Sequence, residues 1–433
     1  MLGKLRILFL IGSIALIGAD RIDLLAGHGW FTFTPFLFFA PLAVFSARLS
    51  TGSAHPALAP PMQRQRQFLT PLALFLFFVL ASVPFGLDPE RGTVLFVGLL
   101  LVAGLGYCIS ALILAEPAQG KLIVRSVGFS LILYLVFCVG ECISFSHGVY
   151  LSENQTLTWQ QSVFAPMWLG HVVPRLSGTT VDPNRAGFLL TMYLILLDRF
   201  TARSRLTFVL RCAIAIFVLL TLSRSAILCW LVYNLLSRGL WARLASRRSV
   251  AVLAAAAVIL SFAVITYHQE IEDLAAAWDI SEAVFEKMDM SEGSSGGDHI
   301  ALIQRGLEVW QTSPQTAILG IGFGAAPKVL SDFFGTDKYG NFHCLYVSVL
   351  AESGPIAFLL LMFILCYPAI ARKGTVSCIL AIMAFNLSYQ SHMEPLFWLV
   401  LALLWSFEQR ERSWPWMLPV GSTAASSSEV PGV

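Results

Sequence analysis

Residues 93–115 read TVLFVGLLLVAGLGYCISALILA, an apolar stretch without a charged side chain. A helix needs about 20 mostly apolar residues to cross the hydrocarbon of a bilayer. Over the 433 residues of the chain, 57% are hydrophobic and only 12% are charged, whereas a soluble domain carries about 25% charged residues. Because no soluble core could bury so many apolar blocks, the composition excludes a water-soluble globule and a disordered chain. The sequence predicts a protein that uses the bilayer as its solvent.

Similar apolar blocks recur along the chain and predict an all-α, polytopic membrane protein with about twelve transmembrane helices. The expected spans are residues 5–19, 30–47, 68–84, 93–115, 122–145, 186–197, 206–222, 225–236, 250–267, 344–368, 375–391 and 395–407. Two connections are long, residues 146–184 and 268–342, and long loops are usually functional. Residues 1–416 thus form one transmembrane domain, and residues 417–433 have the composition of a disordered tail.

Lys and Arg gather in alternate loops, which indicates the orientation of the chain. Cytoplasmic loops of membrane proteins carry an excess of these residues. The pattern therefore predicts that both termini are cytoplasmic and that the two long loops face the opposite side. The net charge of +2 gives no overall field to attract nucleic acid. Most of the eight cysteines lie within or beside spans, so no disulfide framework is expected.

Several ionisable residues lie at the predicted outer ends of the spans. Arg185 opens the sixth span, Arg224 separates the seventh from the eighth, and His343 precedes the tenth. Glu394 lies between the last two spans, and Glu141 is near the outer end of the fifth. Each alone could be an interfacial residue that pairs with a neighbour. Together they predict an outward-facing pocket suited to a diphosphate, because arginine forks bind phosphate oxygens and histidine can take a proton near neutral pH.

The second long loop contains two helical patterns, at residues 268–290 and 299–311, separated by a glycine-rich break at residues 292–298. Arg305 lies on the polar face of the second pattern, toward water or toward a site. The stretch Gly320-Ile-Gly322-Phe-Gly324 follows, and its glycine spacing does not fit a dinucleotide-binding motif. A flexible turn explains it most simply, although its backbone amides could also form an anion-binding nest.

A metal site is not expected. Asp88-Pro-Glu90 has the acid-x-acid form of metal-dependent membrane glycosyltransferases, but a solvated turn explains so short a pattern better. There is no HExxH motif, and the histidines are dispersed.

The polar residues belong to an ordered series of motifs. The series comprises Arg175-Leu-Ser-Gly178, Asp182-Pro-Asn184, Thr221-Leu-Ser-Arg224-Ser225, Arg305-x4-Trp310-x3-Pro314, Gly320-Ile-Gly322-Phe-Gly324 and His343-Cys344-x9-Gly354-Pro-Ile356. In their order and membrane depth these motifs make the chain resemble the O-antigen ligases, within the O-antigen ligase and polymerase superfamily of bacterial inner-membrane proteins. The resemblance extends from about residue 170 to 360. One position departs from it: ligases usually have Asn, Ser or Gln after the loop histidine, where this chain has Cys344.

The resemblance implies glycosyl transfer at the periplasmic face of the inner membrane without a metal or other cofactor. The donor would be O-antigen polysaccharide on undecaprenyl diphosphate, and the acceptor a sugar hydroxyl of lipid A-core. The residues that would hold the diphosphate are Arg224, Arg305, Arg185 and Arg175, with possible support from Glu394, Glu141, Asn184 and Gly322. His343 would act as the base that takes the acceptor proton, or would bind the diphosphate as an imidazolium. Direct inversion at the anomeric carbon is expected, because no candidate nucleophile is evident.

Three other functions stay open. An O-antigen polymerase often has Arg-x10-Gly patterns, and neither Arg175 nor Arg305 has Gly at that spacing. Protein O-oligosaccharyltransferases of the same superfamily usually carry extra outer sequence after the last spans. A transporter or lipid flippase would also explain the hydropathy, but it would place ionisable residues near the midplane and show related halves.

Overall fold

The computed structural model describes residues 2–22, 24, 33–51, 60–146, 167–168, 171–172, 176–221, 223–237, 295–335, 340–371 and 373–406. Within these residues the chain is helical apart from one short hairpin, formed by β1 (Met167–Trp168) and β2 (His171–Val172). The expected span at residues 250–267, the helical pattern at 268–290 and the tail after 416 lie outside the described residues.

The helices follow the apolar blocks of the sequence. They are α1 (Leu2–Ala15), α2 (Pro35–Thr51), α3 (Pro60–Ser82), α4 (Pro89–Ala115), α5 (Gln119–Ser146), α6 (Pro183–Phe200), α7 (Arg205–Leu220), α8 (Arg224–Ser237), α13 (Ser295–Trp310), α14 (Pro314–Leu319), α15 (Ala326–Phe334), α16 (Leu345–Ala371), α17 (Val376–Phe385) and α18 (Pro395–Ser406). Three short 3-10 turns accompany them, η1 (Val83–Phe85), η3 (Lys373–Thr375) and η4 (Ser391–Met393).

Four segments within the described residues are long and apolar enough to cross a membrane: Gln65–Phe85, Pro89–Ala115, Gln119–Ser144 and Leu345–Ala371. Shorter apolar helices lie at Pro35–Leu49, Val376–Phe385 and Pro395–Ser406. The fold is therefore that of a helical membrane protein, and the total of about twelve spans stays a prediction.

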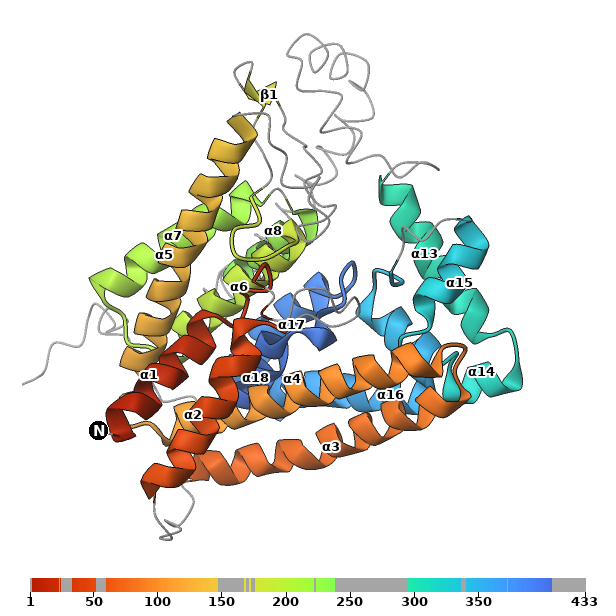
Figure 1. Cartoon of the computed structure of the whole chain (residues 1–433), viewed down its shortest axis with the longest axis horizontal. Helices are drawn as coiled ribbons and strands as arrows, with labels where there is room; N and C mark the ends of the chain where they lie inside the picture. Colours follow the sequence, from red (N-terminus) through yellow and green to blue (C-terminus); the bar gives the residue numbers. More distant parts are fainter. Residues whose placement is uncertain are drawn as a thin grey trace, which may run out of the picture.

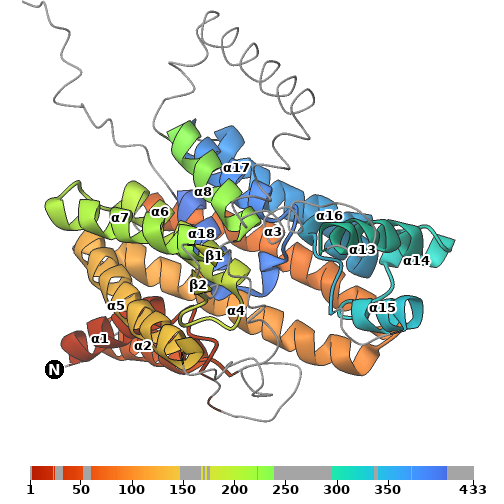
Figure 2. The same ribbon diagram turned by 90° about the horizontal axis from the view of Figure 1, so that it is seen from above.

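Helices α3, α4 and α16 run side by side between two ends of the bundle (Figure 1). At the end that holds the N-terminus, Arg6 Nη2 lies 2.8 Å from Glu116 Oε2, which ties the start of α1 to the turn between α4 and α5. At the other end, the Leu87 N–H donates to the Ile321 carbonyl over 2.9 Å. We call these the N-terminal end and the distal end. Both views place α13, α14 and α15 at the distal end, away from the N-terminus (Figures 1 and 2).

Helices α6 and α18 form the centre of the bundle. Every residue of α18 is buried, and so are the residues of α6 from Ala186 to Leu197. Close packing of α4 on α18 depends on Gly106, where a Cβ would lie 2.9 Å from the Pro395 carbonyl oxygen. The Trp398 indole donates to the His392 carbonyl over 2.6 Å and so holds the turn that precedes α18. The distal starts of these two central helices are therefore fixed in place, and each start carries a predicted site residue.

Candidate functional site

The first polar cluster lies where α6 and α18 begin. Arg185, in the first turn of α6, is paired with Asp20, and its Nε donates to Glu394 Oε2 over 2.7 Å. The Tyr389 hydroxyl donates to the other Glu394 oxygen over 3.4 Å. The side chains of Asp20 and Glu394 are 2% and 10% exposed, and that of Arg185 is 21% exposed. The structure thus brings the predicted residues Arg185 and Glu394 together, and it uses the arginine to neutralise buried carboxylates.

This cluster, which we call the acid-arginine cluster (Asp20, Arg185, Tyr389 and Glu394), contains more acid than base. Burial raises the pKa of Asp20, although the neighbouring Arg185 acts in the opposite direction. Burial likewise raises the pKa of Glu394 to about 7. Oδ1 of Asp20 is buried without a hydrogen-bond partner among the described residues. Two carboxylates therefore share one guanidinium, which favours retention of a proton near neutral pH.

Glu141 holds the first motif of the series in place. Its Oε1 receives a hydrogen bond from Arg21 over 2.5 Å and from the Ser177 hydroxyl over 2.6 Å. Its Oε2 accepts from the N–H of Gly178 over 3.0 Å. Gly178 has φ 57°, and a Cβ there would lie 2.3 Å from the Tyr134 ring, so only glycine fits. Glu141 is 4% exposed and acts in this geometry as an anchor for the loop.

Sequence reasoning missed Asp20 and Arg21, the adjacent residues that hold these two clusters. Asp20 pairs with Arg185 at the start of α6, and Arg21 pairs with Glu141 at the end of α5. The sequence contains a signal for them, because Asp20 and Arg21 are an acid and a base that directly follow the first apolar block. Because charges at such depth tend to pair, a search for partners of the predicted outer charges would have included them.

The distal starts of α6 and α8 lie against each other. The Ser223 hydroxyl donates to Asn184 Oδ1 over 2.7 Å and accepts from the N–H of Ala226 over 3.2 Å, which caps α8. The approach is close because Gly187 faces Ala226, and a Cβ on the glycine would lie 2.1 Å from the Ala226 Cβ. Two helix N-termini therefore meet at one place, and such termini favour anions.

Arg224 is the first residue of α8, at this junction. Its side chain is exposed, and it forms no hydrogen bond or ion pair with the described residues. Arg224 is therefore available to bind an anion, whereas the guanidinium of Arg185 is already paired with two carboxylates.

His343 has a left-handed backbone conformation with φ 53°, which is uncommon for a residue other than glycine. Its N–H donates to Asn341 Oδ1 over 2.8 Å. Two residues later, the Leu345 N–H donates to the carbonyls of Asn386 and Tyr389 over 3.0 and 2.9 Å. These bonds tie the segment that carries His343 to the loop that carries Tyr389 of the acid-arginine cluster. Strained backbone of this kind is typical of functional sites.

Arg305 lies on α13, which packs against α16. Its Nη1 is 3.1 Å from Glu308 Oε2, and its guanidinium carbon lies 4.5 Å from the centre of the Phe333 ring. The next residue, Gly306, faces Phe342, and a Cβ on the glycine would lie 3.1 Å from that ring. Since Phe342 directly precedes His343, this packing connects the helix of Arg305 with the histidine segment.

Gly322 serves packing in the structure. The N–H groups of Ile321 and Gly322 donate to the carbonyls of Ala351 and Glu352 over 2.8 and 3.0 Å. A Cβ on Gly322, which has φ 97°, would lie 2.2 Å from the Cα of Gly86. Because its amides are already hydrogen-bonded, the glycine stretch has the geometry of a packed turn, and the alternative of an anion-binding nest is not favoured.

Arg175 lies outside the described residues. Asp88 caps α4, with Oδ1 accepting from the Arg91 N–H over 3.2 Å, which accounts for the acid-x-acid pattern. In the part of the chain that the structure describes, no three His, Cys, Asp or Glu side chains gather as metal ligands. All eight cysteines are free thiols.

The sequence matches a known protein family over part of its length. Residues 208–362 match the model of the family described as O-antigen ligase. The matched interval runs from α7 to α16 and includes Arg224, Arg305, Gly322 and His343. No curated protein matches the sequence. The match confirms the resemblance found in the motifs and supports membership of the O-antigen ligase and polymerase superfamily.

Proposed function

We propose that the protein is an O-antigen ligase of the bacterial inner membrane. In this proposal it transfers O-antigen polysaccharide from undecaprenyl diphosphate to a sugar hydroxyl of lipid A-core, at the periplasmic face. The observation that supports the proposal most is the position of Arg224. It is an exposed arginine without a partner among the described residues, at the meeting point of two helix N-termini.

The leaving group of this reaction is a diphosphate, and negative charge develops on it as the glycosidic bond breaks. The guanidinium of Arg224 and the N-termini of α6 and α8 would stabilise that charge through preorganised donors. Arg305 would add a second guanidinium, since its pairing with Glu308 is solvent-exposed and therefore weak. In this proposal the arginines do the work that a divalent metal does in other glycosyltransferases.

The acceptor hydroxyl must lose a proton as it attacks the anomeric carbon, with inversion of configuration. His343 is the proposed base, and its partly exposed side chain lies on a segment fixed at both ends by hydrogen bonds. A base in such a position contributes about 10²–10⁴ in rate. Binding of the diphosphate by a protonated His343 is the alternative role.

The geometry changes the role proposed for Arg185. Its guanidinium is held by Asp20 and Glu394, so it would position the start of α6, and with it Asn184, rather than bind the diphosphate. Glu141 and Glu394 are proposed to support the site in the same indirect manner.

Transfer by the purified protein in vesicles tests the proposal. The assay would contain lipid-linked glycan with one of three acceptors: lipid A-core, a second lipid-linked glycan, or a pilin. We expect transfer to lipid A-core, in the presence of EDTA, that is abolished in His343→Ala. Extension of the second lipid-linked glycan would identify a polymerase, and glycosylation of the pilin would identify a protein O-oligosaccharyltransferase. Activity lost in EDTA and restored by a divalent ion would refute the metal-independent mechanism.

A further inference from the structure

Arg305 packs on an aromatic ring that the sequence motifs do not include. Its guanidinium carbon lies 4.5 Å from the centre of the Phe333 ring on α15, and its Nη1 lies 3.1 Å from Glu308 Oε2. The Glu308 side chain is 61% exposed, so water and salt weaken this ion pair. The pair with Glu308 therefore holds the guanidinium only weakly, and the Phe333 ring is its second support.

Glu352 of α16 fixes the start of α15. The N-cap residue of α15 is Ala325, whose side chain makes no capping hydrogen bond. The carboxylate of Glu352 takes that role from another helix, with Oε1 accepting from the Ala326 N–H over 3.1 Å. Glu352 is buried, and its main-chain carbonyl also accepts from the Gly322 N–H over 3.0 Å. Because a carboxylate is favoured at a helix N-terminus, these bonds join α15 firmly to α16.

The end of α15 that carries the ring is fixed as well. Gly335 closes the helix with φ 66°, and its N–H donates to the Ser331 carbonyl over 2.8 Å. The Phe334 ring lies edge-on to the Phe333 ring, with the ring centres 4.8 Å apart, and packs against a hydrophobic cluster. That cluster joins α13, α15 and α16 through buried side chains, among them Leu302, Leu330 and Val347. The Phe333 ring is therefore a fixed surface beside the long side chain of Arg305.

An aromatic ring suits an arginine that binds phosphate. A cation is attracted to the face of a ring, and this attraction uses no N–H donor. The N–H groups of the guanidinium then remain available for phosphate oxygens, whereas carboxylates would occupy them, as they do at Arg185. Contact with a fixed ring also reduces the rotational freedom that the arginine would lose when a ligand binds.

We propose that Phe333 is a positioning residue, which holds Arg305 in place to bind the diphosphate of the lipid-linked donor. The contact with the diphosphate rests on the proposed function, whereas the support of Arg305 by the ring does not. Two measurements on the purified full-length protein test these two parts separately.

The first measurement is the rate at which phenylglyoxal modifies the Arg305 guanidinium, followed by mass spectrometry of the peptide that contains residue 305. Phe333→Leu removes the ring and keeps an apolar side chain at a position that is 51% exposed, so its thermal midpoint should equal that of the parent. We expect Arg305 to react about 2- to 5-fold faster in this variant, as for loss of a cation–π contact at an exposed site. Phe333→Tyr retains a ring and should react at the parent rate. An unchanged rate in Phe333→Leu would overturn the proposal.

The second measurement is kcat/KM for the lipid-linked donor in the vesicle assay. Phe333→Leu should lower kcat/KM by a similar factor, and Phe333→Tyr should restore it. Because the ring acts only through Arg305, Phe333→Leu should cause no further loss in a protein that already carries Arg305→Gln. Losses that multiply in this double variant would show that the ring acts independently of the arginine, and would overturn the proposal. A parent protein without transfer activity would refute the proposed function, and with it the diphosphate part of the proposal, whatever the phenylglyoxal rates.

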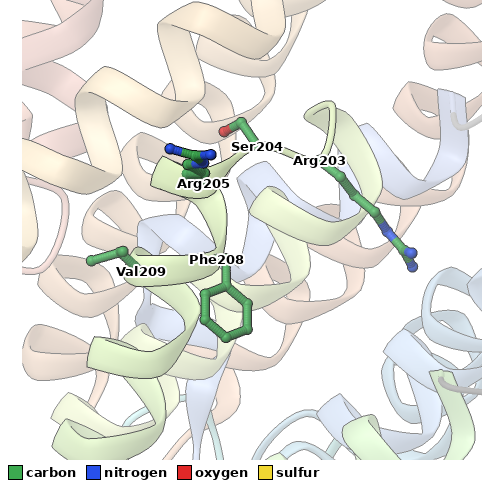
Figure 3. Close-up of a pocket in the computed structure, with 5 residues that line it drawn as sticks. All are labelled: Arg203, Ser204, Arg205, Phe208 and Val209. Carbon is green, nitrogen blue, oxygen red and sulfur yellow. The ribbon is translucent and has the colours of Figure 1, made fainter.

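Phe208→Leu is the matched control. Phe208 is 65% exposed and lines an open pocket where α7 begins (Figure 3). This pocket lies at the N-terminal end, since a Cβ on Gly120, at the start of α5, would lie 3.2 Å from the Phe200 carbonyl oxygen. Phe208→Leu should keep the Arg305 reactivity and kcat/KM within about twofold of the parent values, as is usual for a surface substitution. Equal changes in Phe208→Leu and Phe333→Leu would show a general effect of ring loss and overturn the proposal.

Discussion

Two arginines at the distal end differ in what surrounds their guanidinium groups. Arg185 is paired with two buried carboxylates, whereas Arg224 is exposed and has no ion pair among the described residues. Desolvation of a charge is costly unless the charge is paired, so a paired arginine contributes mainly to the fold. An unpaired arginine at a junction of helix N-termini is available for an anionic ligand.

Arg224→Lys should therefore impair glycan transfer while leaving stability unchanged. An ammonium group retains the charge but does not reproduce the two parallel hydrogen bonds of a guanidinium. Loss of charged hydrogen bonds costs about 1.5–3 kcal/mol each, so we expect a 10- to 100-fold lower transfer rate in the vesicle assay. The matched control is Arg205→Lys at the other end of the bundle, which should transfer at the parent rate. A parent-like rate in Arg224→Lys would exclude bidentate binding by this residue.

His343 allows its two proposed roles to be separated. His343→Asn keeps a side chain that tolerates the left-handed backbone, so the segment should stay folded. It lacks a titratable group, and we expect the transfer rate to fall about 10²–10⁴-fold. If the transfer rate of the parent enzyme rises with pH, the result supports His343 as the base, because a base must be deprotonated. Activity that rises as the pH falls would instead support binding by the imidazolium.

At the scale of elements, the glycine stretch before α15 clamps α3, α4 and α16 together. Gly322→Ala would place a Cβ 2.2 Å from the Gly86 Cα, and this contact is with backbone that has no rotamer to change. Overpacking costs about 1–3 kcal/mol, and the positive φ adds strain, so the thermal midpoint should fall by several degrees. Gly104→Ala is the matched control, since no atom lies within 4 Å of its Cβ. If the thermal midpoint of Gly322→Ala equals that of the control, the close contact of Gly322 with Gly86 does not hold α4 and α16 together.

The sequence predicts elements better than it predicts their partners. The apolar block at residues 93–115 identified α4, and the helix starts earlier, at Pro89, because Asp88 caps it. The span expected at residues 375–391 ends instead at Phe385, because the following loop supplies the carbonyls of Asn386 and Tyr389 to Leu345. Apolar runs determine where a helix can exist, whereas the end of a helix depends on contacts with residues far away in the sequence.

The same limit applies to the candidate site. Membrane depth grouped Arg185 with Glu394 correctly, because charges at the ends of spans collect at one level. Depth contains no information on which charges pair, so the pairing of Arg185 with Asp20 could not be predicted from it. Pairing is decided by the packing of α1 against its neighbours, which a sequence alone does not specify.

At the scale of the whole molecule, the acid-arginine cluster couples stability to pH. It joins the segment that follows α1, the start of α6 and the loop before α18 through one guanidinium. Burial raises the pKa of Glu394 from an ordinary 4.5 to about 7, and also raises the pKa of Asp20, which lies beside it. Two other titratable groups are close to Glu394. Asp182 acts on it electrostatically, and Tyr389 belongs to the cluster.

The sign follows from proton binding. Below pH 4.5, Glu394 is protonated in both the folded and the unfolded chain; between 4.5 and about 7, the unfolded chain releases the proton while the folded chain retains it. The contribution of Glu394 to stability is therefore complete at low pH and is lost as the pH rises through 7. Burial has the opposite effect on His392, lowering its pKa to about 4, so its contribution is lost as the pH falls from 6.5 to 4.

Glu394→Gln separates these opposing effects, because it removes the carboxyl and leaves His392 in place. Relative to this variant, the parent protein should lose stability between pH 4.5 and 7.5, by an amount on the order of 3 kcal/mol. Thermal unfolding in detergent at several pH values measures the difference. Glu308→Gln is the control, since its carboxylate is 61% exposed and the variant should show the pH dependence of the parent protein. Parallel pH profiles for Glu394→Gln and the parent would mean that Glu394 holds no proton in this range and is ionised beside Arg185.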